Sequence, residues 1–235
     1  MKYSLENYWK NIYQRQSDSK YINQSFQSIE IIEWHKEFIE NQIVNQFLNY
    51  KPRVLDIGCC SGYLTNLFCS FSSEVIGLDY DEGFIIDAKT KYSKPKFLEG
   101  DIYNLIKIEG RFDLICCFAV LQHISDLELA LKNIKSKLST KAHSKILFTT
   151  INQNSIFNRN FFARKIMNLQ GQQEFTLSLF SKEQFFKFSH LAGLKITQYE
   201  YIYVLPKSLG FLRSLIKHFL PSSFSHHIFV EMQHI

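Results

Sequence analysis

Long apolar runs and blocks of like charge are missing from this chain of 235 residues. No stretch of about 18 consecutive apolar residues occurs, so the sequence predicts no stable membrane insertion. No block of about five like charges occurs either, and a net charge of +5 is more typical of a solubility feature than of a nucleic-acid-binding face. The stretch MKYSLENYWKNIYQRQ lacks the apolar segment of a secretory signal.

The cysteines argue against a metal site and against a disulfide framework. There are 5 of them, an odd number, and four stand as adjacent pairs at 59–60 and 116–117. Zinc sites usually leave residues between paired cysteines, so we expect no metal ion. Reduced thiols are typical of a reducing compartment, which favours a cytoplasmic location.

Apolar runs and amphipathic stretches alternate along much of the chain. Strands as apolar as these are buried on both faces, as in a parallel sheet. We therefore expect an α/β fold with a Rossmann-like doubly wound sheet, mostly parallel with an antiparallel last strand, and with helices on both faces. The expected strands are 54–57, 74–78, 96–98, 112–118, 145–150, 195–204 and 228–232, and the expected helices are 28–48, 63–71, 82–92, 126–138 and one that follows Ser181.

Two of the expected helices carry a capping-box pattern. Ser125 is followed three residues later by Glu128, and Ser181 is followed by Gln184. Gly193 predicts the end of the second of these helices.

One apolar strand runs directly into a glycine-bearing loop, in RVLDIGCCSG. Gly58 and Gly62 allow the backbone to turn sharply and to approach a ligand closely. Ligands of open α/β sheets bind beyond the carboxyl ends of the strands, so this loop is a candidate site. Taken alone, the spacing fits a tight turn without a ligand equally well.

Two carboxylates follow at the ends of the next two strands. Asp79 comes about 20 residues after the loop, where a carboxylate can accept both hydroxyls of a ribose. Asp101, in LEGDI, can accept from an adenine amino group while Ile102 packs on the ring. The simpler interpretations are a solvated turn for Asp79 and a helix cap for Asp101. The order of loop and carboxylates favours a nucleoside-type cofactor.

The loop does not suit a dinucleotide. It lacks the three glycines of G-x-G-x-x-G that cradle a pyrophosphate. Asp56 also places a negative charge at the loop entrance, which repels phosphate and favours an ammonium or sulfonium group.

At these residues the chain resembles the class I S-adenosylmethionine-dependent methyltransferases. VLDIGCCSG is similar to the first motif of that family, with Cys60 where glycine is usual, and VIGLDYD, LEGDI and FDLICCFAVLQHI are similar to the next three. The resemblance covers about residues 53–154. LFTTINQNS is most similar to the small-molecule branch, which includes ubiquinone-biosynthesis-type O-methyltransferases.

The resemblance implies S-adenosylmethionine as the cofactor and methyl transfer to a small molecule as the activity. No Asp-Pro-Pro-Tyr or Asn-Pro-Pro-Tyr follows the fourth strand, which argues against DNA as the acceptor. Two other hypotheses stay open: a non-catalytic cofactor-binding protein and, less favoured, a nucleotide-dependent oxidoreductase. The implied binding residues are Asp56, Gly58, Cys59, Cys60, Gly62, Asp79, Tyr80, Asp101, Ile102 and Phe118.

His123 is the candidate catalytic base, because it comes just after the fourth strand. A structural histidine that bonds to the backbone before the Ser125 cap is the more common situation, and the sequence favours it. Thr150 and Asn152 end the fifth strand and are candidate acceptor contacts. For Cys60 we expect an ordinary backbone conformation with the thiol packed inward, since a cysteine tolerates positive φ poorly.

Four segments follow from these patterns: an N-terminal helical cap (1–50), a cofactor-binding core (51–150), a lid or substrate segment (151–180) and the C-terminal part of the same sheet domain (181–235). The lid is rich in phenylalanine, which fits either ordinary packing or a pocket for an aromatic or lipidic acceptor. A basic apolar stripe at 209–219 predicts at most weak peripheral contact with a membrane.

Overall fold

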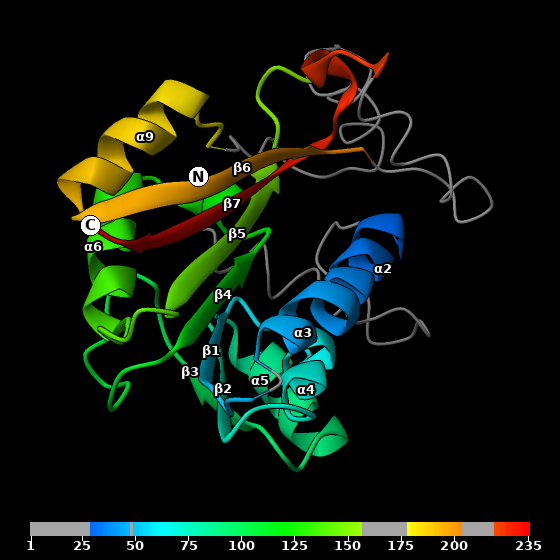
Figure 1. Ribbon diagram of the computed structural model, residues 1–235. Coiled ribbons are helices and arrows are strands. Elements are labelled where there is room, and N and C mark those ends of the chain that lie inside the picture. Colours follow the sequence, from blue (N-terminus) through cyan, green and yellow to red (C-terminus); the bar gives the residue numbers. More distant parts are fainter. Residues whose placement is uncertain (1–28, 48, 157–177, 204–218) are drawn as a thin grey trace, which may run out of the picture. The chain divides into compact units, whose positions relative to one another are not determined.

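The structure is a computed structural model that describes residues 29–47, 49–156, 178–203 and 219–235 (Figure 1). These residues fall into two compact units. The first consists of the chain up to Cys116 together with Ser136–Ser144, and the second of Cys117–Lys135 together with Lys145–Ile235.

Parallel strands form the centre of the first unit. β1 (Arg53–Ile57) pairs in parallel with β2 (Glu74–Asp79) and with the first residues of β4 (Leu114–Phe118), and β2 pairs in parallel with β3 (Lys96–Glu99). β1, β2 and β4 are buried along most of their length. Their apolar residues on both faces make this burial favourable, as the alternation along the sequence predicts.

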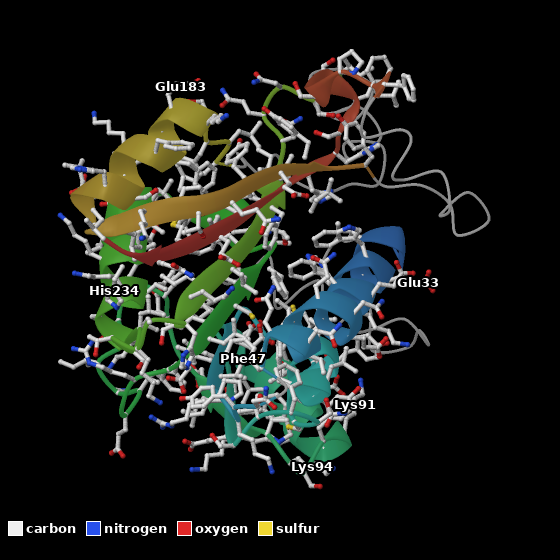
Figure 2. All side chains as sticks on the ribbon, viewed as in Figure 1. Glu33, Phe47, Lys91, Lys94, Glu183 and His234 are labelled. Carbon is white, nitrogen blue, oxygen red and sulfur yellow. The ribbon has the colours of Figure 1, made fainter. Side chains whose placement is uncertain are left out.

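Helices α4 (Tyr63–Phe68) and α5 (Glu82–Lys91) pack against β2 in the same unit. α5 begins at Asp81, whose Oδ1 accepts from the Phe84 N–H at 3.2 Å. Lys91, in the last turn of α5, pairs on the helix surface with Asp87 and is labelled in Figure 2. α4 is shorter than the expected helix 63–71 and ends at Phe68.

The expected helix 28–48 is present with a widened turn inside it. α2 (Ile29–Phe38) continues through the π-helical turn η1 (Ile39–Ile43) into α3 (Val44–Gln46). Phe47 ends this helix, is 3% exposed, and has its ring centroid 6.4 Å from that of Phe71 (Figure 2). The aromatic contact anchors the end of the helix against the rest of the first unit.

The second unit is built on antiparallel pairs. β7 (His227–His234) lies between β5 (Lys145–Ile151) and β6 (Leu194–Ile202) and runs antiparallel to both. The complete strand order is β3-β2-β1-β4-β5-β7-β6, with helices around a sheet that is mostly parallel. This arrangement confirms the predicted Rossmann-like α/β class and the antiparallel last strand.

A buried ion pair fixes the register of these strands. Lys145 Nζ lies 2.9 Å from Glu231 Oε2, and both side chains are nearly buried. Thr197 Oγ1 donates to Glu231 Oε1 at 2.8 Å, next to the register shift between Ile196 and Gln198. The bulge therefore places a hydroxyl where it satisfies the buried carboxylate.

One predicted capping box is confirmed, and the other helix begins one residue later than expected. α9 (Lys182–Leu191) has the complete Ser181–Gln184 capping box, and Gly193 follows its end with φ +73°. α6 (Leu127–Lys137) is capped by Asp126, whose Oδ1 accepts from the Leu129 N–H at 2.9 Å. The helix begins at Leu127, one residue after the expected start at 126.

Several sequence-based predictions fall on residues that the structure does not describe. They include most of the N-terminal cap, the lid from residue 157 to 177, and the basic stripe up to residue 218. The division into four segments therefore stays a prediction. Within the described ranges, no helix has both the length and the apolar character needed to cross a bilayer.

A buried carboxylate holds together the start of β1 and the start of β4. Asp113 Oδ2 accepts from the Tyr50 hydroxyl at 2.6 Å and from the Arg53 N–H at 3.1 Å, and Lys141 Nζ lies 3.1 Å from Oδ1. Burial by itself raises the pKa of Asp113, but the hydrogen bonds from Tyr50, Arg53 and Lys141 bring the pKa below its ordinary value.

We expect Asp113→Asn to lower the free energy of unfolding by about 2 kcal/mol, because it replaces charge-assisted bonds to a buried carboxylate. The pKa of Asp113 is lower in the folded state than in the unfolded chain, where it is about 3.9. The ionised carboxylate therefore stabilises the fold fully above about pH 4, and this contribution is lost as the pH falls through the folded-state pKa. The difference between the two proteins should therefore shrink below about pH 4. Urea unfolding from pH 2.5 to 7 measures it, with the exposed Glu40→Gln as the control; a difference that is independent of pH would contradict the assignment.

Candidate functional site

The loop between β1 and α4 contains three residues in the left-handed backbone region. Gly58, Cys60 and Gly62 have φ values of +76°, +47° and +80°. The N–H groups of Gly58 and Cys59 both donate to the carbonyl of Leu78 on β2, at 2.7 and 3.0 Å. The loop is therefore a tightly turned segment held at the carboxyl ends of β1 and β2.

Gly62 is required by packing as well as by its φ angle. A Cβ atom at Gly62 would lie 2.6 Å from the Phe97 ring, and one at Gly77 would lie 2.7 Å from the same ring. Phe97 is 3% exposed and fills the space that the two glycines leave. The glycine that closes the loop thus lets β3 and α4 approach each other.

Cys59 and Cys60 have different environments. The Cys59 side chain is buried in an apolar cluster that includes Ile85, Ala88 and Phe97, so the thiol belongs to the core. Burial raises the pKa of this thiol well above its ordinary value, and it is unreactive as a nucleophile at neutral pH. Any contact of Cys59 with a ligand would therefore involve its backbone.

The expected ordinary conformation of Cys60 is wrong. Its φ of +47° is in the region that a residue with a Cβ atom adopts at a cost of about 1 kcal/mol or more. The Cys60 N–H donates to Asp79 Oδ2 at 2.8 Å, and this charge-assisted bond stabilises the strained conformation. The compensating partner lies 19 residues further along the chain.

Asp79 organises the end of β2. Besides the Cys60 N–H, its carboxylate accepts from the Asp81 N–H, which lies 3.0 Å from Oδ1. Burial raises the pKa of Asp79 to about 6, and the backbone N–H donors act in the opposite direction. The Tyr80 backbone also donates to this carboxylate. A carboxylate has about four acceptor positions, so it can still accept from a ligand hydroxyl.

Asp56 is a second buried carboxyl at the same end of the strands. It is 4% exposed, and its Oδ2 accepts from the Thr65 hydroxyl at 2.6 Å. Burial raises the pKa of Asp56 to about 7, the Thr65 bond lowers it, and the charge of Asp79 raises it further. In the part of the chain that the structure describes, none of the ion pairs includes Asp56 or Asp79. A cationic ligand group is therefore favoured here.

The remaining first-unit candidates lie at the ends of β2 and β3. Asp101 Oδ1 accepts from the Tyr103 N–H at 2.8 Å and so forms a turn rather than the helix cap that was the simpler interpretation. Ile102 is 7% exposed beside it, whereas Tyr80, which follows Asp79, is 46% exposed. An apolar side chain and an accessible ring thus accompany the two carboxylates.

Phe118 and His123 belong to the second unit. Phe118 is buried, and the next residue, Ala119, has φ +57° and donates its N–H to the Thr149 carbonyl at 2.8 Å. His123 ends the short turn η2 (Leu121–His123), and burial lowers the pKa of its imidazole to about 4. The ring is therefore neutral at pH 7. Nothing in the sequence indicated that Ala119 has a positive φ, because alanine usually adopts negative φ values.

The two polar residues at the end of β5 have structural partners. Asn152 Nδ2 donates to the Ser222 carbonyl at 2.9 Å and to Ser225 Oγ at 2.7 Å, which holds the turn before β7. Thr150 Oγ1 lies 3.4 Å from Gln122 Oε1. Neither contact supports the expected role of Asn152 and Thr150 in acceptor binding. Among the described residues, no group of three His, Cys, Asp or Glu side chains is arranged to hold a metal ion.

Part of the chain is similar in sequence to known methyltransferases. Residues 55–143 match the family described as "Methyltransferase domain". A ubiquinone biosynthesis O-methyltransferase of Coxiella burnetii (strain Dugway 5J108-111) is 33% identical over 123 residues, which is 50% of this chain and 50% of the relative. A malonyl-acyl-carrier-protein O-methyltransferase of Priestia megaterium is 33% identical over 114 residues, 47% of this chain and 40% of the relative. The chain thus spans about half the length, or less, of these curated relatives.

The fold has solved counterparts as well. The crystal structure of an S-adenosylmethionine-dependent methyltransferase from Clostridium acetobutylicum aligns with a TM-score of 0.61 at 18% identity, over 97% of this chain and 98% of that chain. Residues 55–143 are thus similar to a methyltransferase domain, and the likeness to the Clostridium structure shows the fold.

We expect Cys60→Gly to stabilise the protein by about 1 kcal/mol relative to Cys60→Ala, because glycine adopts φ +47° without the strain that a Cβ atom causes. Cys60→Ala is the matched control, since it removes the thiol but keeps the Cβ atom. Urea unfolding of the two variants at pH 7 measures the difference. A glycine variant less stable than the alanine variant would show that position 60 is not strained.

Proposed function

We propose that this protein transfers a methyl group from S-adenosylmethionine to an oxygen atom of a small-molecule acceptor. The similarity of residues 55–143 to a methyltransferase domain supports the type of reaction. The observation that carries the proposal is the left-handed loop at Gly58–Gly62, which the Asp79 carboxylate holds through the Cys60 N–H at 2.8 Å.

The donors and acceptors of the first unit fit the parts of the cofactor. The Asp79 carboxylate suits a ribose hydroxyl, and the Asp101 carboxylate with the apolar Ile102 suits adenine. The glycines of the loop allow close approach by the methionyl part, and Asp56 supplies a negative charge toward its ammonium group. Asp56, Cys60 and Gly62 would thus act on the methionyl end.

S-adenosylmethionine supplies a methyl group on a sulfonium, which is a good leaving group. The protein's own contribution is to orient the acceptor and to exclude water. A hydroxyl acceptor must also lose its proton, and His123 is the candidate base because burial keeps its imidazole neutral. With a pKa of about 4 it is a weak base, so a structural role for His123 remains the competing hypothesis.

The names of the curated relatives support oxygen as the acceptor atom. Both relatives described above are O-methyltransferases, although each match covers half of the relative or less. An aromatic or lipidic acceptor, a cytoplasmic location and the exclusion of DNA are further parts of this proposal. They rest on the phenylalanines of segment 151–180, on the free cysteines and on the missing tetrad after β4.

A non-catalytic cofactor-binding protein is the second candidate. The observation that favours it is that Asn152 and Thr150 form hydrogen bonds within the second unit. Neither contact indicates that these side chains bind a methyl acceptor. An oxidoreductase is less favoured, because the loop has no third glycine for a pyrophosphate.

Addition of S-adenosylhomocysteine at roughly 100 times its Kd should stabilise the protein by about 2.7 kcal/mol and raise its Tm. The same concentration of NADH is the control for a dinucleotide site and should leave Tm unchanged. No shift with S-adenosylhomocysteine would remove the basis of the proposed function.

Incubation with S-adenosylmethionine labelled in the methyl group and a cell extract should yield a labelled small molecule. Mass analysis of the product identifies the methylated atom. A protein that binds S-adenosylhomocysteine but labels no component would support the non-catalytic alternative.

Asp79→Asn should weaken S-adenosylhomocysteine binding about tenfold or more at pH 7, because hydrogen bonds to a charged acceptor contribute about 1.5–3 kcal/mol. In the wild type one step of the affinity should come at about pH 6, where the Asp79 carboxyl is protonated, and the variant should lose this step while it keeps the step of Asp56 near pH 7. Without ligand, the raised folded-state pKa makes the wild type less stable as the pH rises from about 4 to 6. Calorimetric titration from pH 5 to 8 measures both proteins, with Asp87→Asn on α5 as the control; an unchanged Kd would mean that Asp79 is only a turn residue.

A further inference from the structure

A threonine on α4 contacts the Asp56 carboxyl at the end of β1. Thr65 Oγ1 donates to Asp56 Oδ2 at 2.6 Å, and the two side chains are buried, with relative exposures of 0% and 4%. This separation lies in the range of hydrogen bonds from a hydroxyl to an ionised carboxylate. The contact is therefore a strong one between two side chains of the first unit.

The Thr65 hydroxyl does not serve its own helix. A threonine inside a helix commonly bonds to the carbonyl four residues earlier, and its branched side chain is unfavourable for the helix itself. α4 has only 6 residues, and its first residue follows Gly62, which gives no side-chain cap. A threonine in such a short helix costs stability unless its hydroxyl has another partner, and that partner is Asp56.

The groups around Asp56 would otherwise favour its neutral form. The pKa of Asp56 is raised to about 7, mainly by burial and also by the like charge of Asp79 on β2, with the Thr65 bond already included. The Cys59 thiol in the loop is also close enough to interact with Asp56 and brings no positive charge. Thr65 is the group that lowers the pKa of Asp56 in this environment.

We propose that Thr65 is a positioning residue of the cofactor site, whose hydroxyl stabilises the ionised form of the Asp56 carboxyl and holds it toward the cationic ammonium group of the cofactor. The inference rests on the proposed function and deepens it, because it names the residue that sets the charge at the loop entrance. Thr65 itself does not contact the cofactor.

The test is the pH dependence of S-adenosylhomocysteine binding, measured by calorimetry between pH 5.5 and 8.5. Thr65→Val keeps the shape of the side chain and removes the hydroxyl. It should move the loss of affinity at acidic pH upward by about one to two pH units and weaken binding about tenfold at pH 7. Thr65→Ser keeps the donor and should restore the profile of the wild type.

Two controls separate this role from a structural one. In an Asp56→Asn background, Thr65→Val should cause no further change in affinity, because the carboxylate on which it acts is absent. Urea unfolding shows whether each variant is folded, and Thr65→Ala replaces Thr65→Val if the latter is not. Lower stability with an unchanged pH profile would overturn the inference, whereas a wild type that does not bind S-adenosylhomocysteine would overturn the proposed function instead.

Discussion

The hydrogen bond from the Cys60 N–H to the Asp79 carboxylate is the interaction on which the candidate site depends. It joins the strained loop after β1 to the end of β2, at 2.8 Å. The same carboxylate accepts from the Asp81 N–H, and Asp81 in turn caps α5. One side chain thus orients the loop, the strand end and the next helix, and a ligand that binds Asp79 would contact the centre of this arrangement.

The burial of two carboxyls at one end of the strands has an energetic consequence. Burial raises the pKa values of Asp56 and Asp79 to about 7 and about 6, so their ionisation in the absence of ligand is costly near neutral pH. A ligand with hydroxyl donors and a cationic group offsets this cost. The carboxyls therefore favour S-adenosylmethionine over a phosphate-bearing ligand on electrostatic grounds, in agreement with the absence of a third glycine from the loop.

Local patterns predicted most of the architecture but not the conformations that depend on distant partners. The apolar runs located each strand that the described residues form in the sheet, although β4 begins at Leu114, since Phe112 makes an isolated bridge to Leu138. The start of α6 at Leu127 instead of 126 depends on a single residue's backbone angles, and the sequence pattern does not determine them. The strain at Cys60 was missed for another reason: its stabilising partner, Asp79, comes from another strand.

A crystal structure of the protein with S-adenosylhomocysteine tests the central claim most directly. The account predicts that a ribose hydroxyl donates to the Asp79 carboxylate at about 2.7 Å, while the Cys60 N–H keeps its bond to Oδ2. The ammonium group of the ligand should lie on the side of Asp56. A ligand bound elsewhere, or an Asp79 carboxylate that contacts only backbone N–H groups in the complex, would contradict the account.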